Sequence, residues 1–350
     1  MVSVVVLTYN GEKTIGDCLN SVLNQTYDNI EVIVVDNASW DRTKKIVSRY
    51  GENGSPKIKT VENSKNTGFA GHNIGIENSV GEFVLCMNQD VILDKEFISE
   101  ATTLAQQDEK IGAIQGKLLK KNLEGGSEKI IDTTGHLIFK SRRMVDRGQG
   151  ESDKGQYDKP GEVFGVNGAV AFFKKACLED VRLEICRGTA SATRQGRSSA
   201  CAEYYDRDFF MYKEDVDLSW RIRLYGWKIM FCPTAVASVE RTSRPINETS
   251  SAIQEVIKTR RKQTQFVKNL SFKNHRLAII KNDLPWLFIK HLPWILLREV
   301  GAWLYVLFFE PKTWPAIMGL FRQMPRVLRK RKIIMKNKKV GTKEMEKWFV

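Results

Sequence analysis

The chain has 350 residues, of which 42% are hydrophobic and 27% are charged, and its formal net charge is +14. This length and apolar content can fill one large core or two ordinary ones, which excludes an intrinsically disordered protein. The six cysteines form no CxxC pair and there is no histidine cluster at zinc spacing, which argues against a disulfide scaffold or zinc ribbon and for reduced thiols. Because residues 2–7 begin directly as a strand-like run, without a signal segment, we expect a cytosolic protein.

The positive charge is concentrated toward the C-terminus. Residues 1–255 hold 33 Lys and Arg against 36 Asp and Glu, whereas residues 256–350 hold 22 against 5. The first part is therefore close to neutral, and the second carries 22 − 5 = 17 positive charges. A basic block of this size binds anionic lipid or nucleic acid, and composition alone does not choose between them.

Strand-like and helix-like patterns alternate over the first hundred residues. Continuous apolar runs rich in β-branched residues predict strands at 2–7, 30–35, 58–61 and 83–87. The segments between them suit helices at 15–23, 41–50 and 70–79. This order predicts an α/β fold with a mostly parallel sheet, helices on both faces, and a ligand crevice at the carboxyl ends of the strands.

Polar residues follow all four predicted strands, as Thr8-Tyr9-Asn10, Asp36-Asn37-Ala38-Ser39, the segment 63–68, and Asn88-Gln89-Asp90. Such residues are also ordinary turn and cap residues, but turn chemistry does not explain acidic residues at strand ends. We therefore expect the four exits to converge on one ligand. No GxGxxG or GxxxxGK[ST] motif is present, so a dinucleotide site or a P-loop is not supported.

Asp90 is the candidate ligand for a divalent cation. Mg²⁺ or Mn²⁺ needs only one or two protein carboxylates when substrate phosphates supply further oxygens. A second acidic stretch, Lys213-Glu214-Asp215, opens a predicted helix that ends at Gly226. Carboxylates at a helix start are often caps that compensate the helix dipole, and the same position also keeps an Asp ionised for general-base catalysis.

Together these stretches resemble family 2 glycosyltransferases with the GT-A fold, particularly the rhamnosyltransferase-like branch. The resemblance covers about residues 1–245 and rests on segments 4–10, 34–39, 66–71, 88–90 and 213–221, in consistent order. It implies that the donor nucleotide sugar contacts Thr8, Asn10, Asp36, Asn66, Gly68, Phe69, Asn88, Gln89 and Arg221. It further implies that Asp90 holds the cation, that Asp215 is the catalytic base, and that Glu214 is its acidic neighbour near the acceptor.

Two positions depart from that family's pattern. The usual Asp-x-Asp is Asn88-Gln89-Asp90 here, which keeps one carboxylate, and Val239 stands where relatives often place a metal-binding His. Arg241 or Arg244 would then share the neutralisation of the diphosphate. The segment Gly165-Val166-Asn167-Gly168-Ala169 resembles the turn under the donor sugar, with a plain buried strand and Gly turn as the alternative. Residues 187–202 are predicted to be a mobile insertion.

The second predicted unit is a basic, aromatic-rich helical extension at 246–350. Its longest uncharged run, 300–309, is about half a bilayer span, so helices lying in the membrane interface are expected. Trp286, Trp294, Trp303 and Trp314 would anchor them, and the basic run 326–339 would meet anionic headgroups. A dimerising helical appendage is the alternative, and nucleic-acid binding is less favoured because the aromatic residues form apolar clusters.

The resulting hypothesis is an inverting glycosyltransferase on the cytosolic face of a membrane, peripherally bound through residues 284–339. It would move a sugar from a dTDP- or UDP-linked donor to a lipid-linked or cell-surface glycan, with rhamnose favoured by the branch alone. Two alternatives from other classes are an inactive scaffold that keeps the fold and a nucleic-acid-binding protein that uses the basic tail.

Overall fold

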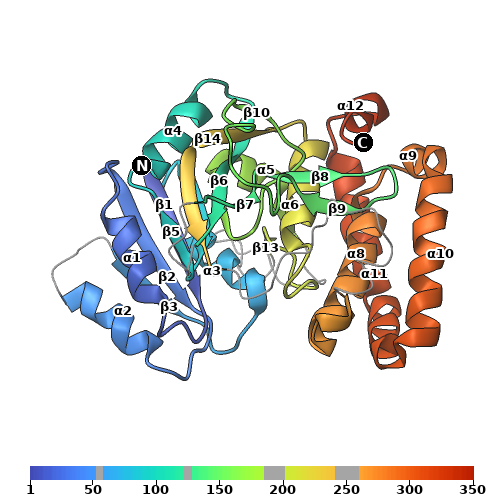
Figure 1. Ribbon diagram of the computed structural model, residues 1–350, viewed down its shortest axis with the longest axis horizontal. Helices are drawn as coiled ribbons and strands as arrows, with labels where there is room; N and C mark the ends of the chain where they lie inside the picture. The colour runs from blue at the N-terminus through green and yellow to red at the C-terminus, as the bar shows by residue number, and fades with distance from the viewer. Residues whose placement is uncertain (53–57, 122–127, 185–201, 241–259) are drawn as a thin grey trace, which may run out of the picture.

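The computed structural model describes residues 1–52, 58–121, 128–184, 202–240 and 260–350 (Figure 1). The predicted insertion at 187–202 lies outside these residues except for Ala202, and so do Arg241 and Arg244. The described chain forms an α/β domain followed by a group of C-terminal helices that stands at one side of it (Figure 1).

The first part of the chain alternates strands and helices as the apolar patterns predicted. Its elements are β1 (Val2–Thr8), α1 (Ile15–Leu23), β2 (Ile30–Asp36), α2 (Thr43–Glu52), β3 (Ile58–Glu62), the 3₁₀ turn η1 (Gly68–Gly71), α3 (His72–Asn78), β4 (Phe83–Asn88), β5 (Val91–Leu93) and α4 (Phe97–Gln106). The central strands are buried on both faces, which is why their sequences are continuous apolar runs without polar alternation.

The second part completes the sheet with longer connections and one buried helix. Its elements are β6 (Ile111–Lys120), β7 (Ile131–Thr133), β8 (His136–Ile138), β9 (Met144–Asp146), β10 (Gly161–Glu162), β11 (Val170–Lys174), α5 (Lys175–Val181), β12 (Leu183–Glu184), β13 (Ala202–Glu203), α6 (Glu214–Leu224) and β14 (Lys228–Val239). Helix α6 is buried along almost its whole length, since it lies between the sheet and the C-terminal helices.

The main sheet has the strand order β10-β14-β6-β11-β4-β1-β2-β3. Strand β1 is parallel to both β2 and β4, and β2 is parallel to β3, whereas β11 runs antiparallel between β4 and β6. In this register Thr8 pairs with Asp36 and Leu7 pairs with Asn88. The polar exits of β1, β2 and β4 therefore lie side by side at one edge, as the parallel order required.

Two apolar cores lie on the two faces of the sheet. Alternate residues of β1 divide between them, with Val4 and Val6 in the core that contains α1 and α4. Val5 belongs to the other core, which contains α3, α5, α6 and residues of the C-terminal helices. This division places the start of α6 on the same face as the C-terminal helices.

The C-terminal unit consists of α8 (Gln265–Asn282), α9 (Pro285–Lys290), α10 (Leu292–Phe309), the 3₁₀ turn η3 (Pro311–Thr313), α11 (Trp314–Asn337) and α12 (Thr342–Glu346). Helix α8 packs against α6 and α11, and α10 lies at the outer edge (Figure 1). The chain end returns to the first domain, where the Val350 amide donates to the Ile138 carbonyl over 3.1 Å.

Candidate active site

The exits of β2 and β3 are joined by Asn37, which is only 2% exposed. Its Nδ2 donates to Asn66 Oδ1 over 2.9 Å and to the Gly68 carbonyl over 3.1 Å, and its Oδ1 accepts from Asn63 Nδ2 over 3.0 Å. Asn66 Oδ1 also accepts from the Gly68 amide over 2.8 Å. Two residues predicted to contact the donor, Asn66 and Gly68, are thus fixed in one loop by a buried amide from the neighbouring strand exit.

Gln89 links the exit of β4 to the exit of β1. Its Oε1 accepts from the Thr8 hydroxyl over 2.5 Å and from the Tyr9 amide over 2.9 Å, and its Nε2 donates to the Tyr9 carbonyl over 3.2 Å. Thr8 is 1% exposed, so its hydroxyl orients Gln89. The middle residue of Asn88-Gln89-Asp90 therefore fixes the two central exits relative to each other.

Asn10 and Asp36 shape the loop that follows β2. Asn10 has a left-handed backbone with φ of 49°, its amide donates to Ser39 Oγ over 2.9 Å, and its Oδ1 accepts from the Trp40 amide over 3.1 Å. Asp36 is 2% exposed and accepts from the Ser39 amide over 3.2 Å, with Lys44 Nζ 3.7 Å away. All three predicted nucleotide residues Thr8, Asn10 and Asp36 therefore lie at the same sheet edge.

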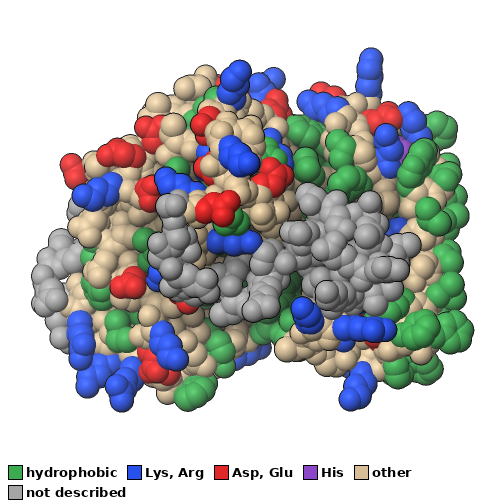
Figure 2. Space-filling view, viewed as in Figure 1, with side chains coloured by type: hydrophobic (Ala, Val, Ile, Leu, Met, Phe, Trp, Pro, Cys, Tyr) green, Lys and Arg blue, Asp and Glu red, His purple; other side chains and the backbone are tan. Residues whose placement is uncertain are grey.

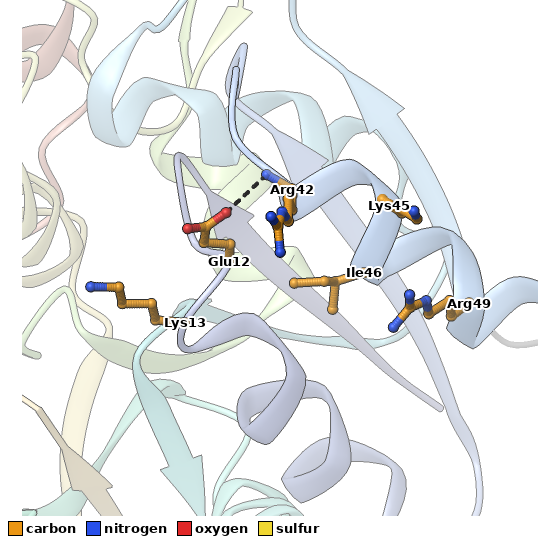
Figure 3. A pocket seen from close by; sticks show the side chains of 6 residues that line it. All are labelled: Glu12, Lys13, Arg42, Lys45, Ile46 and Arg49. Atoms are coloured by element: carbon orange, nitrogen blue, oxygen red, sulfur yellow. Dashed lines mark hydrogen bonds between the residues drawn. The ribbon is translucent and has the colours of Figure 1, made fainter.

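An open pocket of about 520 Å³ lies beside this loop (Figure 3). It is lined by Glu12, Lys13, Arg42, Lys45, Ile46 and Arg49. Glu12 Oε2 accepts from the Arg42 amide over 3.2 Å, which joins the segment before α1 to the start of α2. The pocket contains none of the predicted site residues, and we do not assign it to the active site.

Asp90 lies in the turn between β4 and β5, beside the end of β14. The Glu240 amide donates to the Asp90 carbonyl over 3.4 Å, and Val239 pairs with Val91. Val239 therefore does stand next to the candidate cation site, but it is 2% exposed and supplies no ligand atom. Within the described ranges no three His, Cys, Asp or Glu residues gather as a metal site. A single carboxylate is enough for a cation that Asp90 would hold together with substrate phosphate oxygens.

Asp215 lies in the first turn of α6, which begins at Glu214. Its Oδ2 accepts from the Gly168 amide over 3.0 Å, its Oδ1 accepts from the Val216 amide over 2.7 Å, and its side chain is 15% exposed. The predicted base is therefore oriented by two backbone N–H donors and open on one side.

Glu214, in contrast, is buried, with 3% of its surface exposed. Burial, and then the negative charge of Asp215, hold the pKa of Glu214 well above its usual range. Glu214 therefore keeps its proton to a higher pH than an exposed glutamate does, and its buried side chain is set apart from the partly exposed Asp215.

Three comparisons with known proteins bear on this arrangement. The sequence profile described as glycosyl transferase family 2 matches residues 3–182, which is just over half of the chain. The chain belongs to glycosyltransferase family 2. It is 25% identical over 235 residues to the poly-beta-1,6-N-acetyl-D-glucosamine synthase of Staphylococcus epidermidis, and 25% identical over 240 residues to that of Staphylococcus aureus. These matches cover 67% of this chain and 48% of each synthase, so the chain spans about half the length of these relatives.

Solved structures show that this glycosyltransferase has the GT-A fold. Residues 1–349 of S. aureus TarS superpose with a TM-score of 0.54 at 18% identity, over 96% of this chain and 86% of that one. GalNAc-T7, with UDP, GalNAc and Mn²⁺, gives a TM-score of 0.54 at 14% identity, over 89% of this chain and 58% of that one. The predicted fold class and enzyme class are confirmed, whereas the rhamnosyltransferase-like branch stays a prediction.

One predicted donor contact of the glycosyltransferase is wrong. Arg221 is fully buried, and its guanidinium donates to the carbonyls of Val181, over 2.6 Å, and Tyr204 and to the carboxylate of Asp217 over 3.3 Å. With no exposed surface and its donors already used inside the protein, Arg221 cannot reach a diphosphate. Instead, Arg221 joins α6 to the segments that contain Val181 and Tyr204.

The sequence did not single out His136, which lies beside Asp215, or Asp146, which lies beside His136. His136 Nε2, on β8, lies 3.6 Å from Asp215 Oδ2 and 3.5 Å from Asp146 Oδ1, on β9. Asn167 joins them, because its Nδ2 donates to Asp146 Oδ1 over 2.9 Å. The only sequence signal was the Gly-rich turn at 165–169, which the structure brings against the start of α6.

Proposed function

We propose that this glycosyltransferase moves a sugar from a nucleoside diphosphate donor to an acceptor hydroxyl with inversion at the anomeric carbon. One observation supports this most strongly: the turn at 167–169 contacts both halves of the site. The Gly168 amide donates to Asp215, and the Ala169 carbonyl accepts from the Asn88 amide over 2.9 Å. Two adjacent residues, Gly168 and Ala169, thus hold the proposed base Asp215 and the end of β4, where the donor would bind.

The proposed reaction is a single displacement. Asp215 takes the proton from the acceptor hydroxyl, whose oxygen then forms a bond to the anomeric carbon. The bond between that carbon and the diphosphate oxygen breaks, and the nucleoside diphosphate leaves with the electron pair. When bound at Asp90, Mg²⁺ or Mn²⁺ supplies positive charge to the leaving diphosphate. Glu214, which is buried and has a raised pKa, takes no part in this step.

The donor and acceptor classes follow from the relatives and from the resemblance to one branch. The named relatives synthesise poly-beta-1,6-N-acetyl-D-glucosamine, and one TarS structure holds UDP-GlcNAc. These favour a UDP-linked amino sugar, whereas the branch resemblance favours dTDP-rhamnose. A lipid-linked or cell-surface glycan is the proposed acceptor in both cases.

A thermal-shift screen of UDP- and dTDP-linked sugars, with and without Mn²⁺, tests the donor proposal. A ligand that binds only the folded state stabilises it and so raises the melting temperature. The stabilising free energy grows with the ratio of the ligand concentration to Kd. We expect one class of nucleotide sugar to raise the melting temperature, and we expect a smaller increase in the Asp90→Ala variant. The stereochemistry of the product, read by NMR, tests the displacement. A product with retained configuration would exclude Asp215 as the base of a single displacement.

The second proposed partner is a membrane surface that contacts α9 to α11. Large apolar side chains are exposed on one stripe of α10 at i, i+3, i+7 and i+11, namely Leu297, Val300, Leu304 and Phe308. A second stripe follows on α11 at Trp314, Met318 and Phe321. Figure 2 shows apolar side chains gathered along the edge where α10 lies. An apolar surface of this extent on a single chain marks an interaction site.

The charges around these helices favour a position in the interface. By length and composition alone, helix α10 could cross a bilayer. Its 18 residues have a mean hydropathy of 1.5, and 11% of them are buried. However, the charged residues Arg298 and Glu299 lie near the middle of α10. Glu299 forms a salt bridge with Arg276 of α8 over 2.7 Å. One face of α10 is therefore fixed to the α/β domain through α8, which favours a helix that lies in the headgroup region.

A further inference from the structure

The chain enters α6 through a backbone that few side chains tolerate. Phe210, Tyr212 and Lys213 all have left-handed backbones, with φ of 63°, 68° and 72°. In residues with a Cβ this conformation costs free energy, and it persists only where surrounding contacts impose it. Three such residues stand directly before Glu214 and Asp215, so some group outside the loop has to hold residues 209–213.

That group is Asn274, a fully buried residue in the middle of α8. Its Nδ2 lies 2.8 Å from the Phe209 carbonyl, 2.8 Å from the Met211 carbonyl and 2.9 Å from the Tyr212 carbonyl. One amide therefore contacts three carbonyls of the loop. Among side chains of this size, only that of Asn carries two hydrogen-bond donors on a planar, uncharged group.

The loop connects both halves of the active site. The Phe210 carbonyl accepts from the Phe69 amide over 2.7 Å, and the Lys213 carbonyl accepts from the Asp217 amide over 2.9 Å as the first turn of α6 forms. A Cβ added to Gly68 would lie 2.0 Å from the Phe210 carbonyl oxygen, so the two segments are in close contact. A shift of the loop would move both Asp215 and the donor-side segment at 66–71.

Further contacts from α8 hold the same region from both sides of the loop. Lys273 Nζ donates to the Asp208 carbonyl over 3.1 Å. Lys281 Nζ donates to Asp206 over 2.5 Å and to Asp217 over 2.7 Å, which ties the start of α6 to the same helix. All these groups lie beyond residues 3–182, the part of the chain that the family profile matches.

We propose that Asn274 is a positioning residue for the transfer step. It holds the loop at 209–213 in the left-handed conformation that aims Asp215 at the acceptor, so that α8 of the C-terminal unit completes the active site. This inference rests on the proposed role of Asp215. It also assigns a role in catalysis to a helix of the basic C-terminal extension at 246–350.

The test replaces Asn274 with Leu, which keeps the volume and removes the donors. We expect kcat to fall at least tenfold, KM for the donor to stay within twofold, and UDP binding to persist. Asn269→Leu is the matched control, because Asn269 lies on the same helix and its side-chain oxygen accepts from Gln265 over 2.8 Å. Its kcat should match that of the unchanged protein.

Hydrogen exchange gives a readout that does not depend on activity. In Asn274→Leu the amides of 66–71 and 209–217 should exchange at least tenfold faster, while those of β1 and β2 stay unchanged. Adding Tyr212→Gly should restore part of the lost kcat, since Gly adopts φ of 68° without the Cβ penalty. Asn274→Asp, which keeps the shape without the donors, replaces Asn274→Leu if the latter does not fold.

Unchanged kcat and unchanged exchange in these variants would overturn the proposal. The proposal would also be overturned if kcat and UDP binding fell together and amide exchange became faster throughout the sheet. That result would show that the substitution only lowers global stability. Absence of turnover by the unchanged protein with every donor would instead contradict the proposed function, and the exchange result at 66–71 would still decide the role of Asn274.

Discussion

Glu214 and Asp215 are neighbours in the chain but occupy different surroundings. Asp215 accepts two backbone hydrogen bonds at a helix start and is open on one side, whereas Glu214 is buried with a raised pKa. Two adjacent carboxylates at full charge would repel each other, and burial favours the protonated form of Glu214. The sequence Glu-Asp therefore places one buried carboxyl and one partly exposed carboxyl at the start of α6.

Asp215→Asn should lower kcat by about 10²–10⁴-fold, the usual contribution of a general base. Asparagine can still accept from one amide, so the first turn of α6 should form, and UDP should bind with the affinity of the unchanged protein. Steady-state transfer rates and calorimetry with UDP measure the two quantities. Turnover at the original rate would remove Asp215 from the mechanism.

Glu214→Gln should change the pH dependence of stability. Because the pKa of Glu214 in the folded protein lies above its value of about 4.5 in an unfolded chain, the folded state holds the extra proton in that interval. The free energy of unfolding therefore falls as pH rises from about 4.5 toward the folded pKa. Each tenfold difference in proton affinity corresponds to about 1.4 kcal/mol.

Urea unfolding at pH 5, 6.5 and 8 measures this effect. The Gln variant should lose less stability than the unchanged protein between pH 5 and 8, since its side chain does not titrate. Burial opposes but does not outweigh the charges of Lys281 and Lys330, which lower the pKa of Asp206, so Asp206 stays ionised and adds no slope between pH 5 and 8 in either protein. Identical slopes above pH 5 would contradict a raised pKa of Glu214.

At the scale of elements, buried ion pairs join the C-terminal helices to the α/β domain. Lys330 of α11 is 2% exposed and donates to Asp206, to Asp208 over 2.9 Å and to Glu203 over 3.0 Å. The prediction that residues 326–339 all face lipid headgroups is therefore wrong for Lys330. Its charge is neutralised inside the protein by acidic residues more than a hundred positions away.

Lys330→Met should lower the free energy of unfolding by about 3–5 kcal/mol, because it leaves buried carboxylates without their partner. Lys332→Met, at an exposed position on the same helix, should change it by less than about 0.5 kcal/mol. Urea titrations of the three proteins give both differences. A small effect at Lys330 would mean that Lys281 alone compensates Asp206.

Gly68→Ala should weaken donor binding and lower stability. Gly68 has φ of 62°, and a Cβ there would approach the Phe210 carbonyl to 2.0 Å. The loop at 66–71 would have to move away from the start of α6. Gly301→Ala is the control, since no atom lies within 4 Å of its added Cβ and Ala favours a helix interior by up to about 1 kcal/mol. Equal effects of the two changes would show that the Gly68 contact is unimportant.

The sequence predicted the elements better than it predicted the role of single charged residues. Strands such as β1 and β2 were evident because burial on both faces makes them continuously apolar. Arg221 and Lys330 were misassigned because a long charged side chain is normally exposed. Their burial depends on partners such as the Tyr204 carbonyl and Asp206, which only the tertiary fold brings close.

The contribution of α8 could not be predicted for a related reason. Helix α8 has no strong apolar stripe, since its buried face carries Lys273, Asn274 and Lys281. A pattern of this kind normally indicates an exposed helix. Asn274 meets carbonyls of a loop with a left-handed backbone, and Lys281 meets the carboxylates of Asp206 and Asp217. No local sequence signal reports either arrangement.

At the scale of the whole molecule, the two ends of the long axis have different surfaces. Helices α1 and α2 with their strands form one end, and α10 forms the other, with α8 and α11 between α10 and the active-site helix α6 (Figure 1). Contact of α10 with a membrane would therefore place α6 one helix layer above the lipid. A lipid-linked acceptor held in that membrane would lie on the side of the C-terminal helices.

Replacement of two α10 side chains tests the membrane proposal. Leu297 is 82% exposed and Phe308 is 73% exposed, and full burial of such side chains contributes about 1.5–3 kcal/mol each. Leu297→Asp with Phe308→Asp should weaken binding to vesicles that contain phosphatidylserine at least tenfold, as measured by flotation. Trp40→Ser is the control, because Trp40 is 80% exposed on the loop between β2 and α2, at the other end.

The basic side chains predict a dependence on lipid charge and salt. Lys312, Arg322 and Arg329 are exposed on or beside α11, so binding to vesicles of phosphatidylcholine alone should be weaker and less sensitive to salt. If the stripe is instead a dimer interface, the unchanged protein sediments as a dimer without lipid and the double variant as a monomer. Sedimentation as a monomer with loss of flotation in the variant would distinguish membrane contact from self-association.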